Sequence, residues 1–386
     1  MSRWVERAVR LVAGVEAAVD RVRHGTAART DTRHARVVPY DGYGTPRLLT
    51  VLGRVLRNPP VGPSRAEATV WENLVDTYRR FETDEVPAAR VRVAAGGSQR
   101  EIVADEEGHL LCRLALDQPL PDDGLWHDVT YTLLSPVATE APATMVGRVL
   151  IPSATASFGV ISDVDDTVVQ TDVRQMARMA RTIVFGNART RLPFPGVAAF
   201  YRALAAGTAA GGPNPLFYVS SSPWNLYELL VEFLELQGIP HGPLLLRDWG
   251  IQAHELLPTG HGSHKQAAIR RILESYPALP FVLVGDSGQE DPEIYASIVH
   301  DHPGRILAIY IRDVTRDPMR TSAIQRLATE TEHARCPLVL AEDTVGAARH
   351  AAEQGWIAAD ALREIAGEAE ADDPGGDRPP PLVVEQ

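Results

Sequence analysis

The amino-terminal part of this chain has a helical spacing of apolar residues. Between residues 3 and 23, Val, Ala and Leu share one face of a 100° helical wheel, and Arg residues share the opposite face. This predicts an amphipathic helix, which we place within residues 1–30. Acidic residues such as Glu6 and Glu16 dilute the positive charge of its polar face. Two interpretations therefore stay open: the helix packs on a neighbouring domain, or it lies on an anionic membrane surface.

Short β-type runs replace this pattern between residues 35 and 152. They are separated by turn-forming clusters at 95–98 and 121–124, and one helix is expected at 66–81. The expected strands cover residues 48–56, 91–95, 110–116, 129–134 and 145–151. The pattern predicts a small β-sandwich. Because no polar residues there have the spacing of a catalytic or metal site, we expect an accessory domain.

Apolar strands alternate with helical segments in a third region, residues 153–366. The expected strands cover residues 158–163, 216–220, 244–246, 281–285, 306–311 and 338–340. Strands that are apolar on both faces and joined by helices indicate a doubly wound, parallel α/β sheet, in which ligands bind beyond the carboxyl ends of the strands. Residues 367–386 are rich in Ala, Glu, Asp, Gly and Pro, which predicts a disordered tail.

The composition agrees with a globular protein and restricts its partners. The chain has 386 residues, of which 45% are hydrophobic and 23% charged, enough for two cores. A net charge of −12 argues against nucleic-acid binding, so an anionic ligand must be attracted by a metal or a few local cations. Only Cys112 and Cys336 are present, which fits a reducing cytoplasm. Without an apolar run of membrane-spanning length, we expect a cytoplasmic protein that is soluble or peripheral at a membrane.

Carboxylates follow the first strand of the α/β region. Residues 159–162 are apolar, and Asp163, Asp165 and Asp166 come directly after them. Three carboxylates so close together repel one another unless a cation neutralises them. The sequence therefore predicts a divalent metal at the carboxyl end of this strand.

Hydroxyl side chains follow the second strand. Ser220, Ser221 and Ser222 come directly after the apolar run 216–219, and a helix is expected to begin near Pro223. Hydroxyl groups and the free amides of a helix amino terminus bind phosphate oxygens. We interpret this segment as a phosphate-binding loop.

A second acidic loop, residues 286–291, follows the strand at 281–285. It contains Asp286 and Asp291, and Lys265 precedes it by one helix. A lysine at such a site offsets negative charge that develops during a reaction. The acidic run, the hydroxyl residues, the lysine and the second acidic loop thus occur in one order on one predicted sheet.

This order resembles the haloacid dehalogenase superfamily, which has Asp-x-Asp-x-Thr after one strand, Ser or Thr after a second, a Lys, and an acidic pair after another strand. Within it, the chain is similar to the catalytic domain of the actin-patch phosphatidate phosphatase family. The resemblance covers roughly residues 145–345 and is carried by residues 162–168, 218–225, 244–249, 264–265 and 285–295.

The resemblance implies a phosphatase that uses an aspartyl-phosphate intermediate and Mg²⁺. Asp163 would be the nucleophile, and Asp165 would protonate the leaving alkoxide and later deprotonate water. Ser220 would hydrogen-bond a phosphoryl oxygen, and Lys265 would neutralise charge.

The same resemblance implies the metal and substrate contacts. Asp163, the Asp165 carbonyl and Asp286 would bind Mg²⁺, and Asp291 would hold Lys265 or a metal-bound water. The remaining candidates for substrate binding are Thr167, Ser221, Ser222, Trp224 and Arg247.

The expected shape of the site bears on the substrate. Residues 172–213 leave room for only a short insert, so we expect an open site that accepts a phosphate projecting from a surface, with Trp224 and Trp249 as an interfacial rim. The family-based interpretation is hydrolysis of phosphatidate to diacylglycerol. The alternatives are a phosphatase of a soluble phosphomonoester or phosphoprotein, and a non-catalytic module that binds phospholipids.

Overall fold

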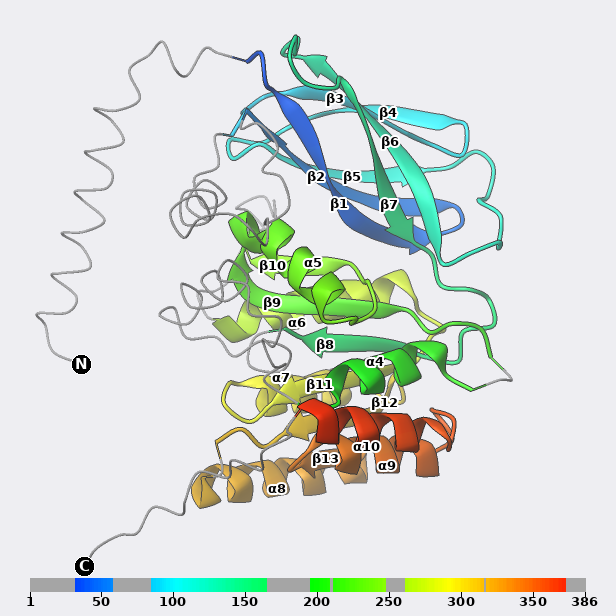
Figure 1. The fold of residues 1–386 in the computed structure, drawn as a ribbon, viewed down its shortest axis with the longest axis vertical. Helices are drawn as coiled ribbons and strands as arrows, with labels where there is room; N and C mark the ends of the chain where they lie inside the picture. The colour runs from blue at the N-terminus through cyan, green and yellow to red at the C-terminus, as the bar shows by residue number, and fades with distance from the viewer. Residues whose placement is uncertain are drawn as a thin grey trace, which may run out of the picture.

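The computed structural model describes residues 32–57, 85–164, 195–208, 211–247, 261–315 and 317–372. The helices expected at 1–30 and 66–81 lie outside these ranges. So do Asp165, Asp166, Thr167 and Trp249. Within the described residues the chain forms a β-rich unit and an α/β unit, which lie one above the other in Figure 1.

The β-rich unit is one seven-stranded sheet, in the order β4-β3-β6-β7-β1-β2-β5. Its strands are β1 (Arg36–Thr45), β2 (Leu48–Leu56), β3 (Arg90–Ala95), β4 (Ser98–Val103), β5 (His109–Ala115), β6 (Trp126–Ser135) and β7 (Thr144–Leu150). All five expected strands are present, whereas β1 and β4 were not predicted as strands. Pro39, Asp41 and Gly42 interrupt the apolar pattern of β1.

The expected β-sandwich is wrong, because the strands belong to one curled sheet rather than two facing sheets. The edge strands β4 and β5 approach each other, as in a partly closed barrel: Arg100 on β4 donates a hydrogen bond to the Arg113 carbonyl on β5 at 3.1 Å. Nearby, the Asp117 amide donates to Ser98 Oγ at 3.0 Å. Since strands alternate between an inward and an outward face in both architectures, the sequence pattern did not distinguish them.

The α/β unit contains a six-stranded sheet in which all neighbouring strands are parallel, in the order β10-β9-β8-β11-β12-β13. The strands are β8 (Gly159–Asp163), β9 (Leu216–Pro223), β10 (Leu244–Arg247), β11 (Phe281–Asp286), β12 (Ile306–Arg312) and β13 (Leu338–Ala341). Each of the six predicted strands is therefore present. They are fully or largely buried, which explains their continuous apolar runs.

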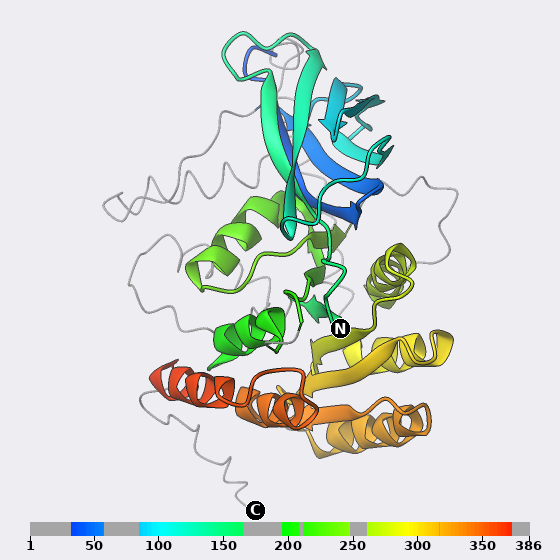
Figure 2. The ribbon, with the colours of Figure 1, turned by 90° about the vertical axis from the view of Figure 1, so that its right-hand side faces the viewer.

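Helices cover both faces of this sheet. They are α4 (Val197–Ala206), α5 (Tyr227–Leu236), α6 (His261–Ser275), α7 (Asp291–Asp301), α8 (Pro318–His333), α9 (Thr344–Glu353) and α10 (Ala361–Asp372). Figure 2 shows α4, α9 and α10 together on one face and α6, α7 and α8 on the other. Among the described helices, none has the length and apolarity to cross a membrane.

Helix α10 corrects the boundary of the expected disordered tail. Residues 367–372 were assigned to that tail but form the last part of this helix. Glu368 accepts a hydrogen bond from the Ala199 amide, and Asp372 accepts one from the Gly196 amide, each at 2.9 Å. These acidic side chains satisfy the free amides at the start of α4, where carboxylates are favoured.

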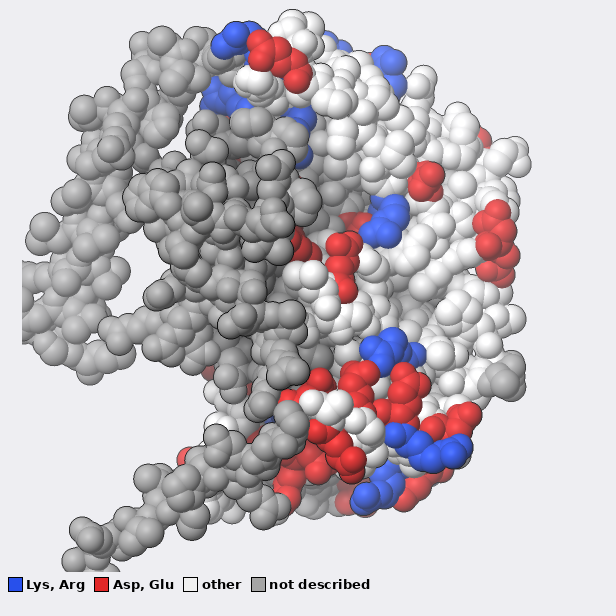
Figure 3. Space-filling model, viewed as in Figure 1, with Lys and Arg blue, Asp and Glu red and all other residues white. Residues whose placement is uncertain are grey.

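Charged side chains of both signs lie side by side on the face drawn in Figure 3, over the helices at the bottom of the view. One such contact joins α4 to α10, because Arg202 forms ion pairs with Glu364 and Glu368. All three side chains are partly or largely exposed, so these pairs contribute little to stability.

Candidate active site

The candidate site lies where the strand order of the parallel sheet reverses. From β8 the chain passes to β9 and β10 on one side, and it then returns to β11 on the other side of β8. Asp163 is the last residue of β8, and Asp286 is the last residue of β11. Both side chains are fully buried. Ligands bind at such reversal points because the connecting loops diverge there.

Lys265, in the first turns of α6, reaches the two carboxylates that flank it. Its Nζ atom lies 2.8 Å from Asp163 Oδ1 and 2.8 Å from Asp291 Oδ1, and it donates a hydrogen bond to Gln289 Oε1 at 3.1 Å. The side chain is only 2% exposed. Burial alone would lower the pKa of Lys265, but Asp163 and Asp291 outweigh it and raise this pKa above its ordinary value. The ammonium group therefore remains charged.

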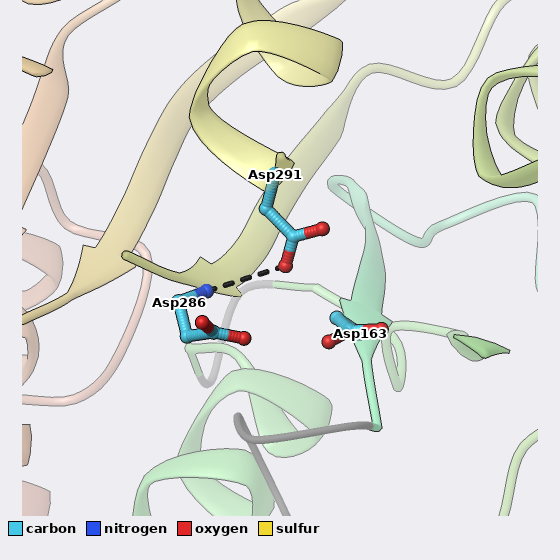
Figure 4. A group of neighbouring side chains, drawn as sticks. All are labelled: Asp163, Asp286 and Asp291. Atoms are coloured by element: carbon cyan, nitrogen blue, oxygen red, sulfur yellow. Dashed lines mark hydrogen bonds between the residues drawn. The ribbon is translucent and has the colours of Figure 1, made fainter. Parts of the chain in front are cut away.

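The acidic loop holds Asp286 through backbone amides. Asp286 Oδ1 accepts hydrogen bonds from the Gly288 amide at 2.6 Å and the Gln289 amide at 3.2 Å. The Asp286 amide donates to Asp291 Oδ2 at 3.3 Å. At Gly285 a Cβ atom would lie 2.6 Å from Asp291 Oδ2, so only glycine permits this close approach. In Figure 4 the Asp286 and Asp163 carboxylates face each other, and Asp291 reaches in from the start of α7.

These side chains fit a hard divalent cation. One oxygen from each of Asp163, Asp286 and Asp291 lies within 4.8 Å of the other two, and all three residues are buried. The three carboxylates and the Lys265 ammonium together carry two net negative charges. Buried charge of this size is costly unless it is compensated, and a set of oxygen donors suits Mg²⁺.

Asp291 uses its two carboxylate oxygens in different contacts. Its Oδ1 atom pairs with Lys265, and its Oδ2 atom accepts the Asp286 amide. Both oxygens are therefore engaged with the protein. This geometry favours the expected contact with Lys265 over direct metal ligation by Asp291.

The hydroxyl residues end a longer strand than expected. Strand β9 continues to Pro223, which pairs with Arg247 of β10, and one 3-10 turn (Trp224–Leu226) separates the strand from α5. The helix predicted near Pro223 thus begins at Tyr227. Ser220 is fully buried, and its Oγ atom accepts a hydrogen bond from the Ser222 amide at 2.9 Å. Ser221 is half-buried beside them.

The structure contradicts the interfacial role expected for Trp224. This side chain is only 3% exposed and stacks on Tyr40 of the β-rich unit, with ring centroids 4.7 Å apart. It therefore offers no surface to a lipid. Arg247, by contrast, is exposed at the carboxyl end of β10.

Two supporting contacts were not foreseen from the sequence. Behind the nucleophile candidate, Ser162 Oγ donates a hydrogen bond to the Asp163 carbonyl at 2.7 Å and lies 2.5 Å from the Tyr201 hydroxyl. Ser162 directly precedes the acidic run, and its polar side chain in an apolar strand was the available signal. Tyr201 is a helical residue that only tertiary packing brings here.

Arg320 on α8 is the second unforeseen contact. Its Nε atom donates to the Ser287 carbonyl at 2.8 Å, and its Nη2 atom donates to the Gln289 carbonyl at 2.5 Å. It also forms an ion pair with Glu293 of α7. Arg320 thereby fixes the backbone of the acidic loop. Nothing in the spacing of residues 318–333 distinguishes it from an ordinary surface arginine.

Comparisons with known proteins agree with this geometry. Residues 158–313 match the family model described as the catalytic domain of phosphatidate phosphatase APP1. Phosphatidate phosphatase APP1 of Saccharomyces cerevisiae is 34% identical over 155 residues, which are 40% of this chain and 26% of that protein. An uncharacterized Schizosaccharomyces pombe protein is 31% identical over 163 residues, which are 42% of this chain and 26% of that protein. The chain thus spans about a quarter of the length of the curated relatives it matches.

Among solved structures, a carbohydrate acetylesterase from Xanthomonas citri is 11% identical, with a TM-score of 0.30 over 79% of this chain and 68% of that chain. A likeness at this score carries no argument about fold or activity. The matched family segment, in contrast, contains Asp163, Ser220, Lys265, Asp286 and Asp291. The α/β part of this chain therefore resembles the catalytic domain of the actin-patch phosphatidate phosphatase family, as its motifs predicted.

Proposed function

We propose that this protein is a Mg²⁺-dependent phosphomonoester hydrolase that forms an aspartyl phosphate on Asp163, with a haloacid dehalogenase-like catalytic fold. The observation that carries the proposal is the buried Asp163 carboxylate at a strand end, 2.8 Å from Lys265 and grouped with Asp286. A carboxylate beside a fixed cation is suited to nucleophilic attack on phosphorus.

In the first half-reaction, an Asp163 oxygen attacks the phosphorus atom and the bond from phosphorus to the leaving oxygen breaks. Lys265 remains protonated and offsets the charge on the nucleophile and the phosphoryl oxygens. Ser220 is a hydroxyl candidate for a phosphoryl oxygen, since it directly follows Val219, the residue of β9 that pairs with Asp163 of β8. Asp165, outside the described residues, is the expected acid that gives its proton to the leaving oxygen.

In the second half-reaction, water attacks the aspartyl phosphate, the bond from phosphorus to Asp163 breaks, and phosphate leaves. Asp165 takes the proton of this water, which restores both carboxyl groups to their starting states. Mg²⁺, held by Asp163, Asp286 and the Asp165 carbonyl, would supply neutralisation of phosphoryl charge. Asp291 would keep Lys265 and the acidic loop in position.

We infer that the substrate is a phosphorylated lipid, and phosphatidate in particular, with diacylglycerol and phosphate as products. The name of the matched yeast relative supports this inference, although the shared segment is 26% of that protein. A peripheral contact with a membrane would follow from such a substrate, and we propose a cytoplasmic location. With Trp224 buried, Arg247 is the described candidate for a head-group contact.

The test is a phosphate-release screen with and without Mg²⁺. The substrates are phosphatidate in mixed vesicles, soluble sugar phosphates and a phosphopeptide, and the control protein is Asp163→Asn. We expect Mg²⁺-dependent release from phosphatidate that Asp163→Asn abolishes. Turnover of soluble substrates alone would replace the lipid assignment with the soluble one. Binding of phosphatidate without any release would support a non-catalytic lipid-binding module and overturn the proposal.

A further inference from the structure

The β-rich unit presents two tyrosines to the α/β unit from the same strand. Tyr40 and Tyr43 are three positions apart, so a regular strand would direct them to opposite faces. The register of β1 against β2 shifts between them, which marks a β-bulge at Asp41 and Gly42. The extra residue brings both rings into the hydrophobic core shared with the α/β unit. The bulge requires glycine at position 42, since a Cβ at Gly42 would lie 2.4 Å from the Thr50 carbonyl oxygen.

Tyr40 packs on the segment that follows the hydroxyl residues. Its ring lies nearly parallel to that of Trp224, at 4.7 Å and 12°, and is tilted against that of Tyr227, at 4.1 Å and 36°. The Asp41 amide, at the bulge, donates a hydrogen bond to the Tyr227 hydroxyl at 2.7 Å. Arg148 holds the Asp41 carboxylate with two hydrogen bonds. The β-rich unit thus contacts the side chains that follow β9, namely the Trp224 ring and both the ring and the hydroxyl of Tyr227.

The contacts of Tyr40 lie next to residues 220–223, the carboxyl end of β9. Among the strands that the structure describes, β8 pairs with β9 as far as Val219, and residues 220–223 lie beyond that pairing, beside β10. These residues include the candidate phosphate-binding hydroxyls, and Trp224 follows them directly. The contact between Tyr40 and Trp224 therefore restrains the carboxyl end of residues 220–223, which lie beyond the last residue pair of β8 and β9.

We propose that Tyr40 is a positioning residue for Ser220, Ser221 and Ser222, which makes the β-rich unit part of the phosphate-binding machinery rather than an accessory domain. This inference rests on the proposed phosphatase function. It extends beyond the matched family segment, since Tyr40 lies outside residues 158–313. In chemical terms, the stack of Tyr40 on Trp224 sets the position of the hydroxyl groups that bind phosphoryl oxygens.

Tyr43 provides a matched control on the same strand. It is as buried as Tyr40, and it packs edge-on against Phe217 at 5.9 Å and near Tyr276 at 6.5 Å. Phe217 lies within the part of β9 that pairs with β8, opposite Ile161. The sheet therefore holds Phe217 in place without Tyr43. Loss of either tyrosine removes one aromatic side chain from the interface. Only loss of Tyr40 removes the aromatic contact with Trp224, which follows the hydroxyl residues.

The experiment compares full-length Tyr40→Leu, Tyr40→Phe and Tyr43→Leu with the parent protein. Inorganic phosphate is the probe, measured as a competitive inhibitor, and Mg²⁺ half-saturation is measured in parallel. We expect Tyr40→Leu to weaken phosphate binding about three- to tenfold, the factor expected for losing one stacked aromatic pair. Mg²⁺ half-saturation should be unchanged. Tyr40→Phe, which keeps the ring, and Tyr43→Leu should bind phosphate as the parent does.

Amide hydrogen exchange gives a readout that needs no activity. Residues 220–224 should exchange faster in Tyr40→Leu than in Tyr43→Leu. Equal phosphate affinity, or equal exchange, in these two variants would overturn the positioning role. If the parent released no phosphate from any substrate, the proposed function would fail, and the exchange comparison would still decide whether Tyr40 holds this segment. Tyr40→Met replaces Tyr40→Leu if the latter does not fold.

Discussion

Removal of the Lys265 charge should destabilise the protein far more than removal of a surface charge. In Lys265→Met the aliphatic stem is largely retained, while the ammonium group between Asp163 and Asp291 is lost. Each of these carboxylates lies 2.8 Å from Nζ and is fully buried. The substitution therefore leaves uncompensated negative charge on two buried carboxylates.

The expected cost follows from this burial. Breaking a buried ion pair by removing one partner costs about 3–5 kcal/mol, because the remaining charge stays desolvated. Arg270 and Asp301 form a matched surface pair between α6 and α7, with side chains 43% and 35% exposed. Such a pair contributes about 0–1 kcal/mol. Lys265→Met should thus exceed Arg270→Met by about 3 kcal/mol in the free energy of unfolding.

Urea unfolding in the presence of a metal chelator measures this difference. The double variant Lys265→Met/Asp291→Asn should recover part of the loss, since it removes one of the two stranded carboxylates. Added Mg²⁺ should stabilise Lys265→Met more than the parent, because the variant site carries more negative charge. If Lys265→Met cost no more than Arg270→Met, the buried charge cluster would not exist as described.

Three further predictions concern other parts of the molecule. Arg320→Gln should raise Mg²⁺ half-saturation by up to about thirtyfold, since it loses two hydrogen bonds of about 1 kcal/mol each to the acidic loop. An unchanged half-saturation would exclude this support. Burial lowers the pKa of His109, so the unfolded state binds a proton more readily than the folded state. The free energy of unfolding should therefore fall as pH decreases below about 6.5. His109→Gln should reduce that fall in pH-dependent melts. Gly42→Ala should lower thermal stability, because its Cβ meets the Thr50 carbonyl; an unchanged melting temperature would contradict the bulge.

The strands and the order of the site residues could be predicted from the sequence because both are local signals. Six buried parallel strands give six apolar runs, and Asp163, Ser220 and Asp286 follow three of them directly. Strand β1 escaped prediction because Pro39, Asp41 and Gly42 break its pattern. The difference between a sandwich and a partly closed barrel depends on pairing, which alternation along one strand does not encode.

The supporting contacts depend on packing between distant segments. Trp224 follows the hydroxyl residues of β9, and the sequence alone favours a membrane-facing ring, whereas in the structure Tyr40, beside the bulge in β1, covers it. Arg320 reaches the acidic loop from α8. Such contacts form only when helices and strands from different parts of the chain meet. The periodicity of a single sequence does not predict them.

The most direct test of the central hypothesis is to trap the covalent intermediate. Acid quenching during turnover of phosphatidate with Mg²⁺, followed by mass spectrometry of the peptides, locates any phosphoryl group. We predict a phosphoryl adduct on Asp163 that is acid-stable, sensitive to hydroxylamine and absent from Asp163→Asn. Phosphate release that persists in Asp163→Asn, or an adduct on a different residue, would contradict the assignment of Asp163 as the nucleophile.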